Sequence, residues 1–294
     1  MRLRDLGDGA RRRLEAAGVP RAEAALDTEL LARDVLGWDR ATWLTRRDDD
    51  EADVDSGIIG ARGRGAFRAA FDALVARRVK REPMAYIRGT QEFYGREFLV
   101  GPGVLIPRPE TELVVDEARA AALGRRTPRL ADVGTGSGCL AVTLALELPS
   151  ATVIATDISA EALTIARGNA AAHEVGGRVT FVETSYLTGL AGGFDVIVAN
   201  PPYVRERDAA SLAPEVRDHE PHLALFGGED GLRDIKAVAQ AASRALKPGG
   251  VLVMEIGIGQ AKAVTAALTA LGLGGELSIR DDLRGIPRVA VAHL

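Results

Sequence analysis

The chain has 294 residues, of which 47% are hydrophobic and 27% charged, a balance that indicates a folded globular protein and excludes a disordered one. Its length allows one large domain and a smaller one. The single cysteine, Cys139, excludes an intrachain disulfide and a four-cysteine zinc site. The formal net charge of -4 lacks the basic surplus typical of proteins that bind nucleic acid through its phosphates, so a nucleic-acid partner is not expected.

Signals for a membrane or for export are missing from the sequence. No apolar run approaches the roughly 18 residues that cross a bilayer. The first residues contain no apolar segment of the kind found in a secretory signal. We therefore expect a cytoplasmic protein with no membrane partner.

Residues 1–80 are predicted to form a small helical domain. Good helix formers with leucines on one face occupy 21–32, and Gly37 is expected to end that helix. A second amphipathic helix is predicted over 67–78. The acidic run 48–51 predicts the start of an exposed loop between them.

Residues 81–109 have a different character. The sequence from Phe93 to Val100 predicts two short strands around a turn at Gly95. Several prolines follow. We interpret 81–109 as a hairpin linker between two domains.

The remaining residues, 110–294, alternate between strand and helix patterns. We expect strands at 129–133, 152–156, 179–182, 194–199 and 251–256, and helices at 139–146, 160–173 and 232–246, the second of these capped by Ser159 and the third stopped by residues 248–250. Near-continuous apolar strands separated by helices predict an α/β fold with a mostly parallel, doubly wound sheet.

A glycine-rich turn joins the first of these strands to the first helix, with the sequence Asp132-Val133-Gly134-Thr135-Gly136-Ser137-Gly138. Glycines allow sharp turns and close approach to a ligand, and the carboxyl ends of the strands form the usual ligand crevice. The turn alone suits a dinucleotide, S-adenosylmethionine or a tight connection. Asp132 favours S-adenosylmethionine, since a carboxylate suits a cationic amino-acid ligand and repels a pyrophosphate.

Asp157 ends the second strand. An aspartate at such a position is often only a turn or cap residue, but it can also accept hydrogen bonds from both ribose hydroxyls of a nucleoside ligand. Its spacing from the glycine turn favours the ribose interpretation. The pair by itself does not separate a nicotinamide dinucleotide from S-adenosylmethionine.

The sequence Asn200-Pro201-Pro202-Tyr203 follows the strand at 194–199 and therefore lies above the same crevice. Such a run could be a simple turn, but a turn requires neither the aromatic residue nor this placement. An amide nitrogen is a poor nucleophile whose lone pair is delocalised. The Asn200 oxygen and the Pro201 carbonyl can accept its two hydrogens, orient the lone pair and stabilise the positive charge that develops during methyl transfer, while Tyr203 can pack on the planar group.

This combination resembles class I methyltransferases that act on amino groups attached to sp2 carbons. That group includes adenine-N6 and cytosine-N4 DNA methyltransferases as well as protein-glutamine N5-methyltransferases. The four-residue motif alone does not choose among them.

Other segments are similar to the PrmC/HemK family of release factor glutamine methyltransferases. They are Glu82–Gly89, Glu92–Gly95, Leu105–Glu112, Glu215–Pro221 and Ala224–Leu232. The resemblance covers residues 80–294 by motif, and residues 1–80 only in size and helical character.

The resemblance implies a class I, Rossmann-like sheet of seven strands, a small N-terminal helical domain that helps hold the substrate, and a β-hairpin linker. It implies methyl transfer from S-adenosylmethionine, without a metal, to N5 of the glutamine in the Gly-Gly-Gln motif of class I peptide chain release factors. The products would be N5-methylglutamine and S-adenosylhomocysteine. The residues expected to act on the substrate are Asn200, Pro201, Pro202 and Tyr203; those expected to bind the cofactor are Asp132, Gly134, Thr135, Gly136, Ser137, Gly138, Asp157, Ser185, Tyr186 and Asn200.

One position departs from the family pattern. The family commonly has an acidic residue followed by a bulky one near the adenine, whereas this sequence has Ser185 and Tyr186. A serine accepts the adenine amino hydrogen more weakly than a carboxylate. Which of the two residues contacts adenine is left open.

Three alternatives to release factor methylation are considered. A nucleic-acid amino methyltransferase would share the reaction motif, but it predicts a basic recognition region that the composition lacks. A ribosomal-protein glutamine methyltransferase is a close neighbour in chemistry. A binding module without catalysis conflicts with the intact motifs. Glu255, which ends a buried strand, is assigned either a substrate contact or a capping role.

Overall fold

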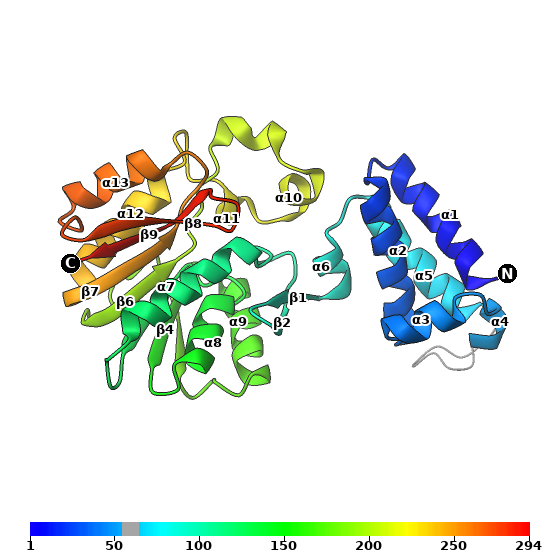
Figure 1. The fold of residues 1–294 in the computed structure, drawn as a ribbon, viewed down its shortest axis with the longest axis horizontal. Helices are drawn as coiled ribbons and strands as arrows, with labels where there is room; N and C mark the ends of the chain where they lie inside the picture. Colours follow the sequence, from blue (N-terminus) through cyan, green and yellow to red (C-terminus); the bar gives the residue numbers. More distant parts are fainter. Residues whose placement is uncertain (55–64) are drawn as a thin grey trace. The chain divides into compact units, whose positions relative to one another are not determined.

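A computed structural model describes residues 1–54 and 65–294. By contacts the chain divides into two compact units (Figure 1). One contains Met1–Gly89 together with Pro214–His219, and the other contains Thr90–Ala213 and Glu220–Leu294. The functional boundaries expected at residues 80 and 109 stay a prediction.

The first unit is helical, as the sequence indicated. Its helices are α1 (Leu3–Ala16), α2 (Arg21–Leu36), α3 (Arg40–Arg46), α4 (Glu51–Val54), α5 (Ala66–Val79), α6 (Met84–Arg88) and α10 (Pro214–His219). Gly37 ends α2 in the left-handed conformation, with φ of 64°. The predicted loop at 48–51 is wrong at its last residue, because Glu51 begins α4; its continuation beyond Val54 lies outside the described residues.

The core of this unit is built from buried side chains of α1, α2 and α5. Phe67 and Phe71 stack with their ring centroids 5.4 Å apart, since residues four apart share one face of a helix. Leu14, Leu31 and Val75 are fully buried beside them.

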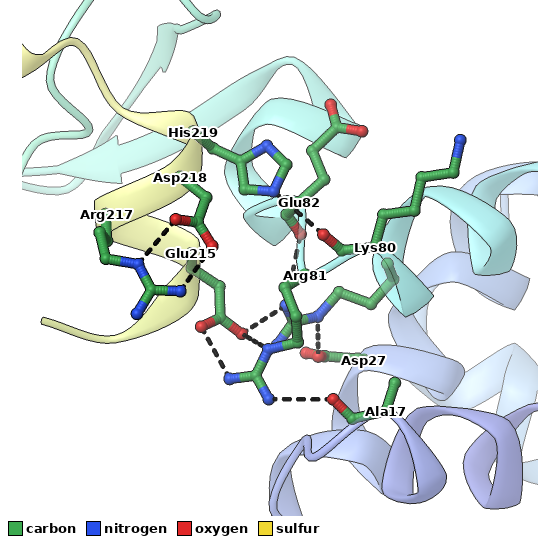
Figure 2. Close-up of polar contacts among 10 residues, drawn as sticks. Ala17, Asp27, Lys80, Arg81, Glu82, Glu215, Arg217, Asp218 and His219 are labelled. Atoms are coloured by element: carbon green, nitrogen blue, oxygen red, sulfur yellow. Dashed lines mark hydrogen bonds and ion pairs between the residues drawn. The ribbon is translucent and has the colours of Figure 1, made fainter. Parts of the chain in front are cut away.

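Helix α10 is an unexpected member of the helical unit, because its sequence neighbours on both sides belong to the other unit. Figure 2 shows the ion cluster that holds it. Glu215 accepts hydrogen bonds from Arg78 at 2.7 Å and from Arg81 at 2.7 and 2.8 Å, and Arg78 also donates to Asp27 at 2.7 Å. Arg78 is 4% exposed. A buried arginine shared by two carboxylates therefore ties α10 to α5 and α2.

The second unit is a seven-stranded sheet with the strand order β5-β4-β3-β6-β7-β9-β8 (Figure 1). The strands are β3 (Arg129–Val133), β4 (Thr152–Asp157), β5 (Val179–Glu183), β6 (Phe194–Ala199), β7 (Leu246–Glu255), β8 (Leu277–Asp281) and β9 (Pro287–His293). The first five in this order are parallel, whereas β9 runs antiparallel to both β7 and β8. The predicted α/β fold and the implied seven strands are confirmed.

Helices cover both faces of the sheet. They are α7 (Glu112–Ala122), α8 (Cys139–Glu147) and α9 (Ala160–Ala172), with α12 (Arg233–Ala245) and α13 (Ala261–Ala270). The strand β6 shows the alternation: Val196 and Val198 pack in one core cluster with α7 and α8, while Ile197 and Ala199 pack in the other with α12 and α13. Burial on both faces explains why residues 196–199 of this strand are apolar without a break.

Two details differ from the sequence expectation, and one is confirmed. The helix expected to reach residue 246 ends at Ala245, and β7 begins at Leu246 rather than at 251. The residue before Pro248 is disfavoured in a helix, so the chain leaves the helical conformation early. The cap at Ser159 is confirmed, since its side chain accepts a hydrogen bond from the Ala162 amide at 3.1 Å.

The hairpin is formed by β1 (Thr90–Phe93) and β2 (Arg96–Leu99), which turn at Tyr94 and Gly95 as the sequence indicated. Phe93 and Phe98 are fully buried in the sheet unit. The hairpin is followed by a short 3-10 helix, Pro109–Thr111, that leads into α7.

Candidate active site

A cavity of about 210 Å³ lies at the carboxyl ends of β3, β4, β5 and β6. Parallel strands with right-handed helical crossovers leave a crevice at this edge of a sheet. The lining residues come from the segment before α7, the glycine turn and the start of α8, the ends of β4 to β6, the start of α9, residues 221–224, and α12.

The glycine turn adopts conformations that only glycine accommodates easily. Gly134, Gly136 and Gly138 have φ of 74°, 54° and 80°. At Gly138 a Cβ would also meet the Cβ of Ala166 at 3.0 Å, so this glycine allows α8 and α9 to pack closely. Gly134, Thr135, Gly136 and Ser137 line the cavity, whereas Gly138 does not.

Asp132 lies beneath the turn and does not line the cavity. Its Oδ2 accepts hydrogen bonds from the Thr135 hydroxyl at 2.6 Å and the Ala141 amide at 3.1 Å. Burial raises the pKa of this carboxyl to about 7, although these two hydrogen bonds oppose the shift. Among the described residues, Oδ1 has no partner. Asp132 thus ties the turn to α8, and its contact with a cationic ligand stays a prediction.

Asp157 lies at the end of β4 and lines the cavity. Its Oδ2 accepts the Gly136 amide and its Oδ1 accepts the Ser159 amide, each at 2.9 Å. These bonds fix the carboxylate in place. Each oxygen retains a lone pair that can accept a hydroxyl of a ligand.

The residues after β5 form another wall. Both Ser185 and Tyr186 line the cavity. Tyr186 has a φ of 52° and donates its hydroxyl to Asp234 at 2.8 Å. Burial and this carboxylate raise the pKa of Tyr186 to about 12, so the phenol stays protonated at neutral pH.

Sequence reasoning missed three lining residues on this side. Asp234 and Val238 come from α12, and Ile158 follows Asp157 with half of its surface exposed. The signal in the sequence was an apolar residue directly after the strand-end aspartate, at the edge where ligands bind. Nothing in the sequence pointed to α12, because its approach depends on the sheet order.

The four residues of the proline motif do not all face the cavity. Asn200, Pro201 and Pro202 line it, but Tyr203 does not. Asn200 donates its Nδ2 hydrogen to the Thr111 hydroxyl at 3.1 Å, and the Tyr203 hydroxyl donates to Glu255 at 3.1 Å. The structure thus places the Asn200 amide in the cavity wall and holds the Tyr203 hydroxyl on Glu255 outside that wall. The stacking expected for Tyr203 stays a prediction.

The segment Phe226–Leu232 packs closely against the backbone of the proline motif, residues 200–203. A Cβ on Gly227 would lie 2.5 Å from the Pro202 carbonyl oxygen, and one on Gly231 would lie 2.3 Å from that of Tyr203. Gln260 also donates to the Tyr203 carbonyl at 3.1 Å. These glycines are required because the two backbone segments touch.

The chain matches two family descriptions. Residues 111–217 match the methyltransferase small domain, and residues 5–56 match the PrmC N-terminal domain. It is 43% identical to the release factor glutamine methyltransferase of Koribacter versatilis, an alignment that covers 100% of this chain and 99% of that protein. It is 42% identical to the release factor glutamine methyltransferase of Geobacter sulfurreducens over 98% of this chain and 95% of that protein. The chain belongs to the release factor glutamine methyltransferase family.

Solved structures support the fold of the family's catalytic sheet. The catalytic domain of hMettl16 aligns with a TM-score of 0.55 at 15% identity, covering 76% of this chain and 91% of that one. A methyltransferase from Pyrococcus furiosus aligns with a TM-score of 0.50 at 18% identity, covering 68% and 90%. The resemblance to PrmC/HemK and the class I methyltransferase fold are therefore confirmed, and the protein is a methyltransferase.

Family and fold imply S-adenosylmethionine as the methyl donor, and the site suits it. The glycine turn leaves the cavity floor open, the fixed Asp157 carboxylate can take the ribose, and Ile158 and Val238 offer apolar surface to a ring. Among the described residues, no cluster of histidine, cysteine, aspartate or glutamate side chains could hold a metal ion. Of the helices in 1–54 and 65–294, none combines the length and apolar character needed to cross a bilayer.

Proposed function

We propose that this protein transfers the methyl group of S-adenosylmethionine to N5 of the glutamine in the Gly-Gly-Gln motif of class I peptide chain release factors. S-adenosylhomocysteine is the other product, and the reaction takes place in the cytoplasm, where release factors work. The observation that carries the proposal is the Asn200 amide, which lines the cavity with its nitrogen committed to Thr111. Its oxygen remains to accept a hydrogen from a substrate amide.

In this mechanism Asn200 and Pro201 bind and orient the amide group of the substrate glutamine. The Asn200 oxygen and the Pro201 carbonyl each accept one hydrogen of the glutamine amide, which turns the nitrogen lone pair toward the methyl carbon. The same two acceptors stabilise the positive charge that grows on nitrogen as the bond forms. The sulfonium supplies a reactive methyl group, so no strong base is needed, and the proton leaves after transfer.

The remaining residues hold the donor. Gly134, Thr135, Gly136 and Ser137 accommodate its amino-acid part, and Asp157 accepts the ribose hydroxyls. Ser185 and Tyr186 lie on the side assigned to adenine. The helical unit holds the release factor, a role supported only by its resemblance to the PrmC N-terminal domain.

Incubation with labelled S-adenosylmethionine and a purified, unmethylated release factor should label the release factor in stoichiometric amount. A release factor with Gly-Gly-Ala in place of Gly-Gly-Gln, duplex DNA and a ribosomal protein preparation serve as parallel acceptors. Label on the intact release factor alone is the expected result. Label on DNA or a ribosomal protein instead would overturn the substrate assignment while leaving the methyltransferase family intact.

Asp157→Ala should weaken binding of S-adenosylmethionine by about tenfold to a hundredfold, because two hydrogen bonds to a charged acceptor are lost. Isothermal titration calorimetry measures this directly. Glu183→Ala is the matched control, since Glu183 pairs with Asp157 in the sheet register but is exposed and does not line the cavity. Equal affinities for Asp157→Ala and the control would remove Asp157 from the ribose site.

A further inference from the structure

Asn200 is connected to a buried carboxylate through a threonine hydroxyl. Its Nδ2 lies 3.1 Å from Thr111 Oγ1, which in turn lies 2.6 Å from Glu255 Oε2. Thr111 is 2% exposed and Glu255 is 1% exposed. The three residues come from the end of β6, the turn before α7 and the end of β7, and the fold brings them together so that Asn200 and Thr111 line the cavity and Glu255 does not.

The direction of these hydrogen bonds is fixed by chemistry. A threonine hydroxyl has one hydrogen and two lone pairs, and Glu255 Oε2 lies within hydrogen-bonding distance to accept that hydrogen. Thr111 therefore gives its hydrogen to Glu255 and presents a lone pair to Asn200. Only the NH2 end of the Asn200 amide can satisfy that lone pair, so the oxygen end is turned toward the cavity.

Tyr203 reinforces this arrangement from the other side of the carboxylate. Its hydroxyl donates to Glu255 Oε1 at 3.1 Å, so both oxygens of Glu255 receive a hydrogen. Burial raises the pKa of Glu255, but the Thr111 and Tyr203 hydroxyls and the nearby Arg288 all oppose this shift. The pKa of Glu255 remains above its ordinary value, and in the structure each of its two oxygens accepts one hydroxyl hydrogen.

We propose that Thr111 and Glu255 are positioning residues that set which end of the Asn200 amide faces the methyl acceptor. The inference rests on the proposed function, because it concerns the same asparagine. An amide rotated by 180° would point its own hydrogens at those of the glutamine, and it could neither orient the lone pair nor stabilise the developing charge. The relay removes this unproductive orientation before substrate arrives.

Thr111→Val keeps the shape of the side chain and removes the hydroxyl. We expect kcat to fall about tenfold to a hundredfold, because the Asn200 side-chain amide can then adopt both orientations and is no longer held in position. The dissociation constant for S-adenosylmethionine should stay within about twofold, since Thr111 acts on the acceptor side. Thr111→Ser restores the hydroxyl and should recover kcat to within about threefold of the unmodified protein.

Thr143→Val is the matched control. Thr143 is fully buried in α8, and among the described residues its hydroxyl has no hydrogen-bond partner, so kcat should not change. Glu255→Gln is a second, independent variant, because a carboxamide can donate to Thr111 and so reverse the relay. It should lower kcat as Thr111→Val does, and it tests the proposal if the valine variant does not fold.

A double-mutant cycle separates positioning from general damage. In an Asn200→Ala background, Thr111→Val should cause no further loss of residual transfer, because the group it orients is gone. The same fractional loss in both backgrounds, or a wild-type kcat in Thr111→Val and Glu255→Gln, would overturn the relay. Wild-type transfer by Asn200→Ala would instead overturn the proposed function, so the two failures are distinguishable.

Discussion

Asn200→Ala is expected to lower kcat for release factor methylation by about a thousandfold or more. Removing a single preorganised polar group at the reacting centre costs a factor of about 100 to 1,000, and here the orientation of the nucleophile is lost as well. Binding of S-adenosylmethionine should change little, since the glycine turn and Asp157 remain. Single-turnover transfer of labelled methyl, combined with calorimetric titration of the donor, measures both quantities on one preparation.

Asp157→Ala provides the reciprocal comparison for this result. Saturating S-adenosylmethionine should restore much of the rate of Asp157→Ala, because only donor affinity is impaired. No concentration of donor should restore Asn200→Ala. If Asn200→Ala methylated the release factor at the normal rate, the Asn200 oxygen would not be the hydrogen-bond acceptor for the reacting glutamine nitrogen.

Arg78→Met is expected to destabilise the helical unit by about 3–5 kcal/mol. Removing one partner of a buried ion cluster leaves uncompensated charge, which costs far more than the intact pair contributes. Here the buried Asp27 would lose its cation, while Glu215 would keep only Arg81. Urea unfolding followed by tryptophan fluorescence measures this unit alone, because both tryptophans, Trp38 and Trp43, lie in it.

The control is Arg77→Met, one position earlier on α5. Arg77 pairs with Glu82, but 42% of its side-chain surface is exposed, so the substitution should cost about 1 kcal/mol or less. Equal losses for the two variants would show that burial of the Arg78 cluster adds nothing to stability.

The same cluster predicts a dependence on pH. Burial alone would raise the pKa of Glu215, but hydrogen bonds from Arg81 and Arg78 outweigh it and lower the pKa to about 2. Because the folded pKa lies below the ordinary value of 4.5, the stabilisation is complete above about pH 4.5 and is lost as the pH falls toward 2. The difference in urea midpoint between the unmodified protein and Glu215→Gln should therefore shrink between pH 6 and pH 3.

Much of the catalytic unit follows from local sequence pattern. Apolar strands ending in Asp157 and Ala199, and a glycine turn after β3, predicted both the parallel sheet and the edge at which ligands bind. This succeeds because strand direction and helical crossovers bring the carboxyl ends of parallel strands to one edge. Gly134 and Gly136 could likewise be placed in the cavity wall, since the turn itself demands positive φ.

The sequence alone therefore determined the family, the fold class and part of the crevice lining, including the glycine turn, Asp157 and Asn200. Only the tertiary structure decided what holds those residues. Asn200 bonds to Thr111, which lies 89 residues earlier in the chain, and Thr111 bonds to Glu255, which lies 144 residues after Thr111 and 55 after Asn200. The assignment of α10 to the helical unit through Arg78 and Glu215 spans 137 residues. Such contacts depend on strand order and on the path of long connections, whereas helix and strand periodicity reports only which face of an element is buried.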